Sequence, residues 1–281
     1  MSARPLTLKR IQSYRKKTFR LAKPIKTKAQ AVDFVSERGF VYFWPISGIT
    51  LPSLWAAVAG DRPVADAHDD PGHVTWGWKD SALSERVWYY AKVLRKKATM
   101  IALDVTPYFY ALSENYGDPA NDYLILHEQG LLTHEAKAVY EVLLRKGATD
   151  SVSLRKDARL NEARFNKAIE ELQADFKILP VGVAKAGAWK YAFVYDLVTN
   201  HFPKLAEAAR PISHRGARHK LAELYFRSVG AEQLRDVTRL FGWKPADAEK
   251  AVADLAEAGA VRRGLTVDSQ PGEWIAVAEL I

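Results

Sequence analysis

The sequence contains an internal repeat, in which one pattern is read twice at a spacing of 83 residues between Lys137 and Val261. Each copy predicts a helix, a glycine-marked turn, a short helix, a second amphipathic helix and two β-strands joined by a glycine-containing turn. This order is typical of a winged helix-turn-helix, which binds nucleic acid, so we look for function there first. The spacing pairs Gly147 with Gly230, Leu154 with Val237, Ala168 with Ala251, Ile169 with Val252, Leu172 with Leu255 and Ile178 with Val261.

The expected fold is mainly α-helical with small β wings, arranged as three tandem winged helix-turn-helix units. The first third of the chain follows the repeated order less regularly, and we interpret it as a divergent copy. The predicted segments are a basic N-terminal arm over residues 1–28, the first unit with a helical connector over 29–130, the second unit over 131–205 and the third over 206–281.

Start and stop signals place the individual elements within these units. In the first unit we expect helices over Ala29–Arg38, Leu54–Ala59 and Ser84–Leu94, and a strand over Ala98–Leu103. In the second we expect a helix over Lys137–Arg145 after an N-cap at Thr133, with wing strands near Ile178–Val181 and Trp189–Leu197. The third unit should form wing strands over Ala260–Val267 and Glu273–Ala278.

Composition excludes several classes of protein. The chain has 281 residues, of which 48% are hydrophobic, enough for two or three domains. Because it has no cysteine, it cannot form disulfides, Cys-ligated zinc sites or iron–sulfur clusters. It also lacks a run of 18 apolar residues, a secretory signal and the nucleophile-elbow, Walker A and dinucleotide-binding motifs. We expect a cytoplasmic, nucleoid-associated protein that has no membrane partner and uses no small-molecule cofactor.

Positive charge is concentrated in the arm, where ten Lys or Arg occur without an acidic residue. Since the net charge is +8, the rest of the chain sums to −2. A cationic arm on a near-neutral body suits a polyanion, because neutralising phosphates releases counterions. A disordered tail and an organelle transit peptide are the alternatives for this charge run. The DNA contacts expected from the arm are Lys9, Arg10, Arg15, Lys16, Lys17 and Arg20.

The second amphipathic helix of the second unit predicts a DNA-facing surface. Its apolar residues, among them Phe165 and Leu172, recur at helical spacing and should face the core. The opposite face and the preceding helix are basic, which suits contacts to phosphates and groove edges; an ordinary solvated face is the alternative. The residues expected to contact DNA are Arg155, Lys156, Arg159, Arg164, Asn166 and Lys167.

The matching helix of the third unit is acidic, with Asp247, Glu249, Asp254 and Glu257 against Lys250. A phosphate backbone would repel it, so the two copies should differ in role. DNA contacts from the third unit are expected instead from Arg235 and Arg239 on the preceding helix, or from Arg262 and Arg263 at the wing.

Three winged-helix units, with Gly39-Phe40-Val41-Tyr42-Phe43-Trp44-Pro45 in the first and Leu240-Phe241-Gly242-Trp243 in the last, resemble the AlkZ/YcaQ-like DNA glycosylases. The resemblance implies tandem winged helices in a C-shaped arrangement around duplex DNA. It also implies excision of damaged or cross-linked purines without a metal.

The catalytic signature of that family reads Gly-Phe-Val, then Gln, a hydrophobic residue, and Gln or Asp. Here Tyr42 and Trp44 occupy the two polar positions, with Phe43 as the hydrophobic residue between them. A monofunctional glycosylase must hold a water and stabilise an oxocarbenium-like charge, which requires a carboxylate or amide oxygen. A Tyr phenol is neutral at pH 7 and Trp only donates, so the resemblance supports DNA binding better than this catalysis.

Other residues of the first unit offer alternative chemistry. In the loop His68-Asp69-Asp70-Pro71-Gly72-His73, either Asp could position a water, or the two His with an Asp could bind a metal; ordinary turn chemistry is the alternative. Asp80, beside Trp76 and Trp78, is a further candidate acid. The many aromatic residues nearby fit either a pocket that stacks an extruded base or a plain core.

The sequence therefore predicts a duplex-DNA-binding protein related to AlkZ-like glycosylases. Three alternatives stay open: an active glycosylase that uses Asp69, Asp70 or Asp80, a winged-helix transcription regulator, and a protein-interaction scaffold that docks a partner on its acidic helix.

Overall fold

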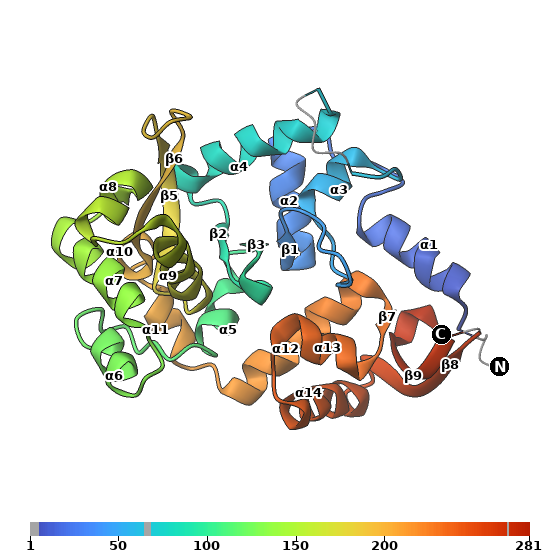
Figure 1. Cartoon of the computed structure of the whole chain (residues 1–281). Helices are drawn as coiled ribbons and strands as arrows, with labels where there is room; N and C mark the ends of the chain where they lie inside the picture. The colour runs from blue at the N-terminus through green and yellow to red at the C-terminus, as the bar shows by residue number, and fades with distance from the viewer. Residues whose placement is uncertain (1–5, 65–68, 269) are drawn as a thin grey trace. The chain divides into compact units, whose positions relative to one another are not determined.

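The computed structural model describes residues 6–64, 69–268 and 270–281 (Figure 1). The chain folds into two compact units, each discontinuous in sequence. Unit 1 contains the described residues up to Trp78, together with Met100–Ala102 and His214–Ile281. Unit 2 contains Lys79–Thr99 and Leu103–Ser213. The third predicted module thus shares a compact unit with the N-terminal part of the chain, and the second module lies in the other unit.

The second copy of the repeat forms three helices and a small antiparallel sheet in the strand order β4-β6-β5. Its predicted helix after Thr133 and both predicted wing strands are confirmed. The elements are α7 (His134–Lys146), β4 (Thr149–Asp150), α8 (Ser151–Asp157), α9 (Glu162–Ala174), β5 (Ile178–Ala184) and β6 (Ala192–Leu197).

The third module repeats this succession, and its sheet has the equivalent order β7-β9-β8. Its elements are α12 (His214–Val229), β7 (Ala231–Glu232), α13 (Leu234–Phe241), α14 (Pro245–Glu257), β8 (Val261–Val267) and β9 (Gln270–Val277). Both ends of α9 and α14, and both ends of β5 and β8, lie 83 residues apart. The repeat read from the sequence is therefore a repeat of structure.

Local capping explains where the helices of the second module begin. The side chain of Asp150 accepts hydrogen bonds from the backbone N–H groups of Val152 and Ser153, both at 3.0 Å, and thereby starts α8. Asn161 caps α9 in the same way, because a helix has no internal partners for its first N–H groups. The predicted inward face of α9 is confirmed, since Phe165, Ala168, Ile169 and Leu172 are all buried.

In unit 2 the predicted helix over Ser84–Leu94 is wrong. Helix α4 (Val74–Glu85) ends earlier, and Tyr89–Lys92 form strand β2. The ring of Tyr89 stacks on Phe176 at a centroid distance of 4.8 Å, and β-prone aromatic side chains gain from such packing in an extended segment. Unit 2 also contains α5 (Thr106–Tyr110), α6 (Asp122–Glu128), α10 (Val198–His201), α11 (Leu205–Ala209) and the turn η2 (Leu94–Lys96), while β3 (Ala98–Ile101) crosses the boundary between the units.

In unit 1 the two predicted helices of the first third are confirmed as α2 (Lys28–Arg38) and α3 (Leu54–Ala59). Gly39, with a φ of 82°, ends α2, because that backbone conformation is unfavourable for residues with a Cβ. Unit 1 also contains α1 (Leu8–Thr18), β1 (Phe40–Tyr42) and the short turns η1 (Pro71–His73) and η3 (Ala278–Leu280).

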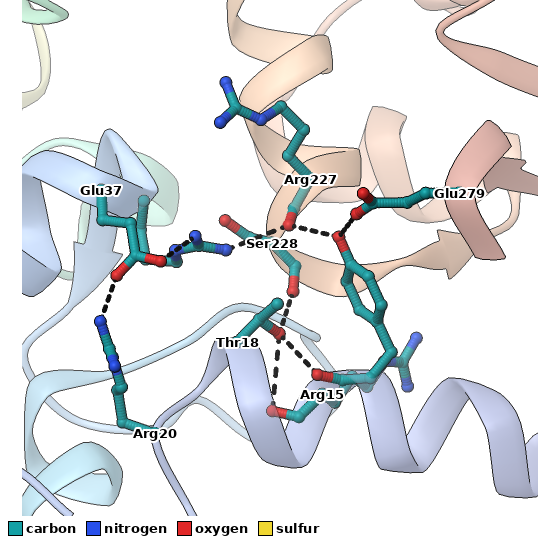
Figure 2. A network of polar contacts seen from close by, with 9 residues as sticks. Arg15, Thr18, Arg20, Glu37, Arg227, Ser228 and Glu279 are labelled. Carbon is teal, nitrogen blue, oxygen red and sulfur yellow. Dashed lines mark hydrogen bonds and ion pairs between the residues drawn. The ribbon is translucent and has the colours of Figure 1, made fainter. Parts of the chain in front are cut away.

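Much of the basic N-terminal segment forms α1, which packs against α12 (Figure 2). Side chains of α1 donate to carbonyls at the end of α12: Tyr14 Oη to Arg227 O at 3.0 Å, and Thr18 Oγ1 to Ser228 O at 2.7 Å. The last carbonyls of a helix lack internal partners and carry partial negative charge. Helix α1 therefore serves as a C-terminal cap for α12.

Across the part of the chain that the structure describes, no helix combines the length and the apolar character needed to cross a membrane.

Candidate nucleic-acid interface

Helices α8 and α9 place the predicted basic residues of the second module on the outside of unit 2. Lys156, Arg159 and Lys167 are exposed and form no salt bridge with any described residue. Arg164, with a side chain 66% exposed, lies 3.6 Å from Glu135, and Arg155 lies 3.4 Å from Glu162. Exposed pairs at such distances contribute little, so this face keeps positive charge available for an anionic ligand.

The β5–β6 wing adds three residues that the sequence reasoning did not select (Figure 1). Lys185 and Lys190 are exposed in the turn between the strands, and Trp189 is 92% exposed. The available signal was a lone large aromatic residue in the turn Lys185-Ala-Gly-Ala-Trp-Lys190, where it has no apolar neighbour large enough to cover it.

In the third module, several charged side chains form ion pairs with one another. On the predicted acidic face of α14, Asp254 receives a bidentate contact from Arg215 with both bonds at 2.7 Å. Arg215 accordingly lowers the pKa of Asp254. Arg263, expected to contact DNA, instead forms hydrogen bonds with Glu249. Arg262 remains exposed on the same strand.

Two further arginines of this module lie on α13 and face outward. The side chain of Arg235 is 68% exposed and lies 3.9 Å from Asp236. The side chain of Arg239 is 53% exposed and lies 3.8 Å from the same carboxylate. Arg239 also donates to the backbone oxygen of Gly48 at 3.2 Å. Of these two arginines, Arg235 therefore has the greater freedom to meet a phosphate.

The six basic residues expected from the arm fall into different environments. Arg15 is committed to unit 1, since it donates to Val229 O at 3.0 Å and Ala231 O at 2.6 Å. Lys16 pairs with Asp61, and Arg20 pairs with Glu37. Arg10 is half-buried, whereas Lys9 and Lys17 are exposed. Of these six residues, Arg15 has the contacts that most restrict its side chain.

The two residues at the catalytic positions of the family motif belong to the core or its edge. Tyr42 is fully buried, and its backbone N–H donates to Pro52 O at 2.9 Å. Trp44 is half-buried, with its ring 4.5 Å from that of Trp55. Phe43 packs edge-on against Trp55 and Trp76. Within unit 1 the rings of Phe43, Trp44, Trp55 and Trp76 thus pack on one another.

Asp70 is held by an internal ion pair. Arg62 donates to its two carboxylate oxygens at 2.7 and 3.0 Å, and the backbone N–H of Gly72 donates to it at 2.7 Å. These contacts, first that with Arg62, lower the pKa of Asp70, which makes it a weaker proton acceptor. Asp69 is exposed, and His68 lies outside the described residues. Among the residues described, no three His, Asp or Glu side chains form a group that could hold a metal ion.

Asp80 is the partner of a buried lysine within unit 2. Its Oδ1 accepts hydrogen bonds from Lys79 Nζ and from Tyr191 Oη, the latter at 2.9 Å. The Lys79 side chain is fully buried, with its ammonium 4.5 Å from the ring centre of Phe193 and 3.0 Å from Tyr191 Oη. A carboxylate engaged in this manner neutralises a buried charge.

Comparisons with known proteins identify a matching family and a similar solved structure. The model of the AlkZ-related family matches residues 25–242. The structure of Streptomyces sahachiroi DNA glycosylase AlkZ is similar with a TM-score of 0.61 and 12% sequence identity, covering 98% of this chain and 71% of that chain. Among curated proteins there is no match. At such low identity, the structural similarity establishes a shared fold.

Proposed function

The chain belongs to the AlkZ-related family, and from that premise we propose that it binds duplex DNA through tandem winged-helix units and does not excise bases with the usual glycosylase motif. The family and the fold relate it to DNA-repair glycosylases. We further assign the surface that contacts DNA and the consequence of the altered motif for base excision.

The exposed cationic face of the second module is the observation that carries the proposal. Helix α9 packs on the core through its buried apolar side. The opposite side of α9 and the outer side of α8 therefore both face solvent. Lys156, Arg159 and Lys167 lie on this side without a salt bridge to any other described residue. In a winged helix-turn-helix these two helices cross the backbone and enter the major groove. Unpaired lysine and arginine side chains there would exchange condensed counterions for phosphate contacts.

The acidic α14 assigns the two repeated modules different roles. Three of its four carboxylates, those of Asp254, Asp247 and Glu249, pair with Arg215, Arg218 and Arg263, so these three arginines stabilise unit 1 rather than extend a cationic surface. We assign the groove contacts to the second module, and to the third module only backbone contacts by Arg235 and Arg262.

Salt-dependent binding tests the proposal. Fluorescence polarisation of a labelled duplex should show an affinity that falls by roughly 10³ to 10⁵ between about 50 and about 200 mM salt, as expected for six to ten phosphate contacts. A Lys156→Glu, Arg159→Glu, Lys167→Glu triple variant should weaken binding and reduce the salt slope by about three. Lys250→Glu on α14 is the matched control and should leave the affinity unchanged. A flat salt response of the wild-type protein would refute DNA binding.

Excision is tested separately. Duplexes that carry an alkylated purine or an interstrand cross-link are incubated with the protein and then cleaved with alkali. No strand breaks are expected, because Tyr42 is buried and Asp70 is paired with Arg62. Breaks that appear with the wild-type protein and vanish in an Asp69→Asn variant would show instead an active glycosylase with a different acid.

A further inference from the structure

The tip of the β5–β6 wing presents Trp189 to solvent with 92% of its surface exposed. A single exposed apolar residue is common on protein surfaces and by itself indicates nothing. Here, however, the residue is the largest side chain available, and the segment around it is positively charged. From Val181 to Tyr191 the chain contains two lysines, Lys185 and Lys190, and no carboxylate.

The turn that carries Trp189 has a defined geometry. The backbone N–H of Lys190 donates to Gly187 O at 3.1 Å, which closes the turn around Ala188 and Trp189. Gly187 has a φ of 76°, and a Cβ there would lie 3.4 Å from Cγ2 of Val152 at the start of α8. Gly187 in this turn thus lies close to the first residues of α8.

Tyr191, which lies two residues after Trp189 and directly before β6, anchors the hairpin. Tyr191 Oη lies 3.0 Å from Lys79 Nζ and donates to Asp80 at 2.9 Å. Its ring also packs edge-on against Phe193 with centroids 5.6 Å apart. Because Lys79 is fully buried, these contacts hold β6 against α4 within unit 2. An exposed indole therefore projects from a supported and anchored hairpin.

We propose that Trp189 is a stacking residue for DNA, whose indole occupies a position where a base is missing or unpaired while Lys185 and Lys190 neutralise the flanking phosphates. The inference rests on the proposed function, because it requires the module to lie on a duplex. A planar ring between two cations complements a base face between two phosphates, and aromatic side chains inserted at unstacked steps act in this way. The wing would thereby sense a gap in the base stack without reading the sequence.

Two duplexes of identical sequence test this, one intact and one with a single tetrahydrofuran abasic-site analogue at its centre. The wild-type protein should bind the abasic duplex more tightly. Trp189→Ala should weaken binding to the abasic duplex by roughly 5- to 150-fold, the range for loss of one base–aromatic stack, and leave binding to the intact duplex almost unchanged. Trp189→Phe should keep most of the preference, because a phenyl ring still stacks.

Tyr116→Ala is the matched control, since Tyr116 is another strongly exposed aromatic residue of unit 2, at 72%. If wild-type protein binds both duplexes and Trp189→Ala retains the preference, or if Tyr116→Ala loses it equally, the inference is wrong and DNA binding stands. If Trp189→Ala weakens both duplexes to the same extent, the residue is a general contact and the inference is also wrong. If wild-type protein binds neither duplex at low salt, the proposed function fails with it.

Discussion

Arg15 Nη2 lies 2.9 Å from Glu232 Oε1, with side chains that are 22% and 7% exposed. The same guanidinium donates to two backbone carbonyls just before Glu232, and the neighbouring polar contacts of α1 and α12 are drawn in Figure 2. The pair joins residues 217 positions apart, one in the most basic segment of the chain and one in strand β7. An arginine that charge alone marks as a DNA contact is thus a structural residue of unit 1.

Replacing Arg15 by Ala should lower the free energy of unfolding by about 3–5 kcal/mol, because it leaves a buried carboxylate without its partner. Burial already raises the pKa of Glu232, and Arg15 opposes that rise. Urea unfolding measures the change. Lys17→Ala, on the exposed side of α1, is the control and should stay within about 0.5 kcal/mol of wild type. An Arg15→Ala protein as stable as that control would show that the ion pair contributes nothing.

The equivalent glycines of the repeat should respond differently to alanine. Gly147 and Gly230 both follow a helix and have φ values of 71° and 77°. A Cβ on Gly147 would meet no atom within 4 Å, whereas one on Gly230 would lie 2.6 Å from Cδ1 of Tyr14. Gly147→Ala should cost about 1–3 kcal/mol from backbone strain alone. Gly230→Ala should cost more, because Tyr14 must also move.

A double-mutant cycle with Tyr14→Ala separates the two causes. In that background the extra cost of Gly230→Ala should disappear, and the two glycine positions should become similar in urea unfolding. An unchanged difference between them would place its origin outside the contact with Tyr14.

The Lys79–Asp80 pair predicts an asymmetry between its two members. Asp80→Ala should destabilise unit 2 by about 3–5 kcal/mol, since it leaves a fully buried ammonium without its carboxylate. Lys79→Met should cost much less, because it removes the buried charge and keeps a side chain of similar length among Tyr90, Tyr191 and Phe193. Equal losses for both variants, in denaturant unfolding, would contradict this account.

The same lysine predicts a dependence of stability on pH. Burial lowers the pKa of Lys79 from its ordinary value of 10.5, although the hydrogen bond to Asp80 opposes the shift. Between the folded and the unfolded pKa the unfolded chain binds more protons, so the free energy of unfolding rises with pH in that window. The gain is lost again as the pH falls through the folded pKa.

Comparing wild type with Lys79→Met from about pH 7 to about pH 10 isolates this contribution, since other groups titrate in both proteins. Wild type should gain stability relative to the variant as the pH rises. Lys177→Met serves as an independent comparison, because burial lowers the pKa of Lys177 as well. A difference between wild type and Lys79→Met that does not change with pH would contradict a lowered pKa.

Periodic patterns predicted the repeated part of the fold well. The inward face of α9, the N-cap at Thr133 and the register between α9 and α14 follow from spacing and capping signals that act over a few residues. Strand β2 was missed because Tyr89 and Tyr90 are buried by residues distant in sequence, among them Phe176. The same contrast holds for the candidate site. The basic residues of α8 and α9 were predicted because they lie on or beside an amphipathic helix with a regular apolar spacing. Trp189 was missed because it lies in a turn, which has no such periodicity.

The amino-acid sequence by itself determined that two copies of one module exist, where their helices begin and end, and which sides of those helices are apolar, because each depends on neighbours within a few turns. Only the tertiary structure decided what each charge does. Arg15 pairs with Glu232, Arg263 pairs with Glu249 on another element, and Asp80 accepts a hydrogen bond from the distant Tyr191, while Lys156 and Lys167 have no such partner among the described residues. The physical reason is that an ion pair depends on distance in space and on exclusion of water, and neither is encoded in local spacing.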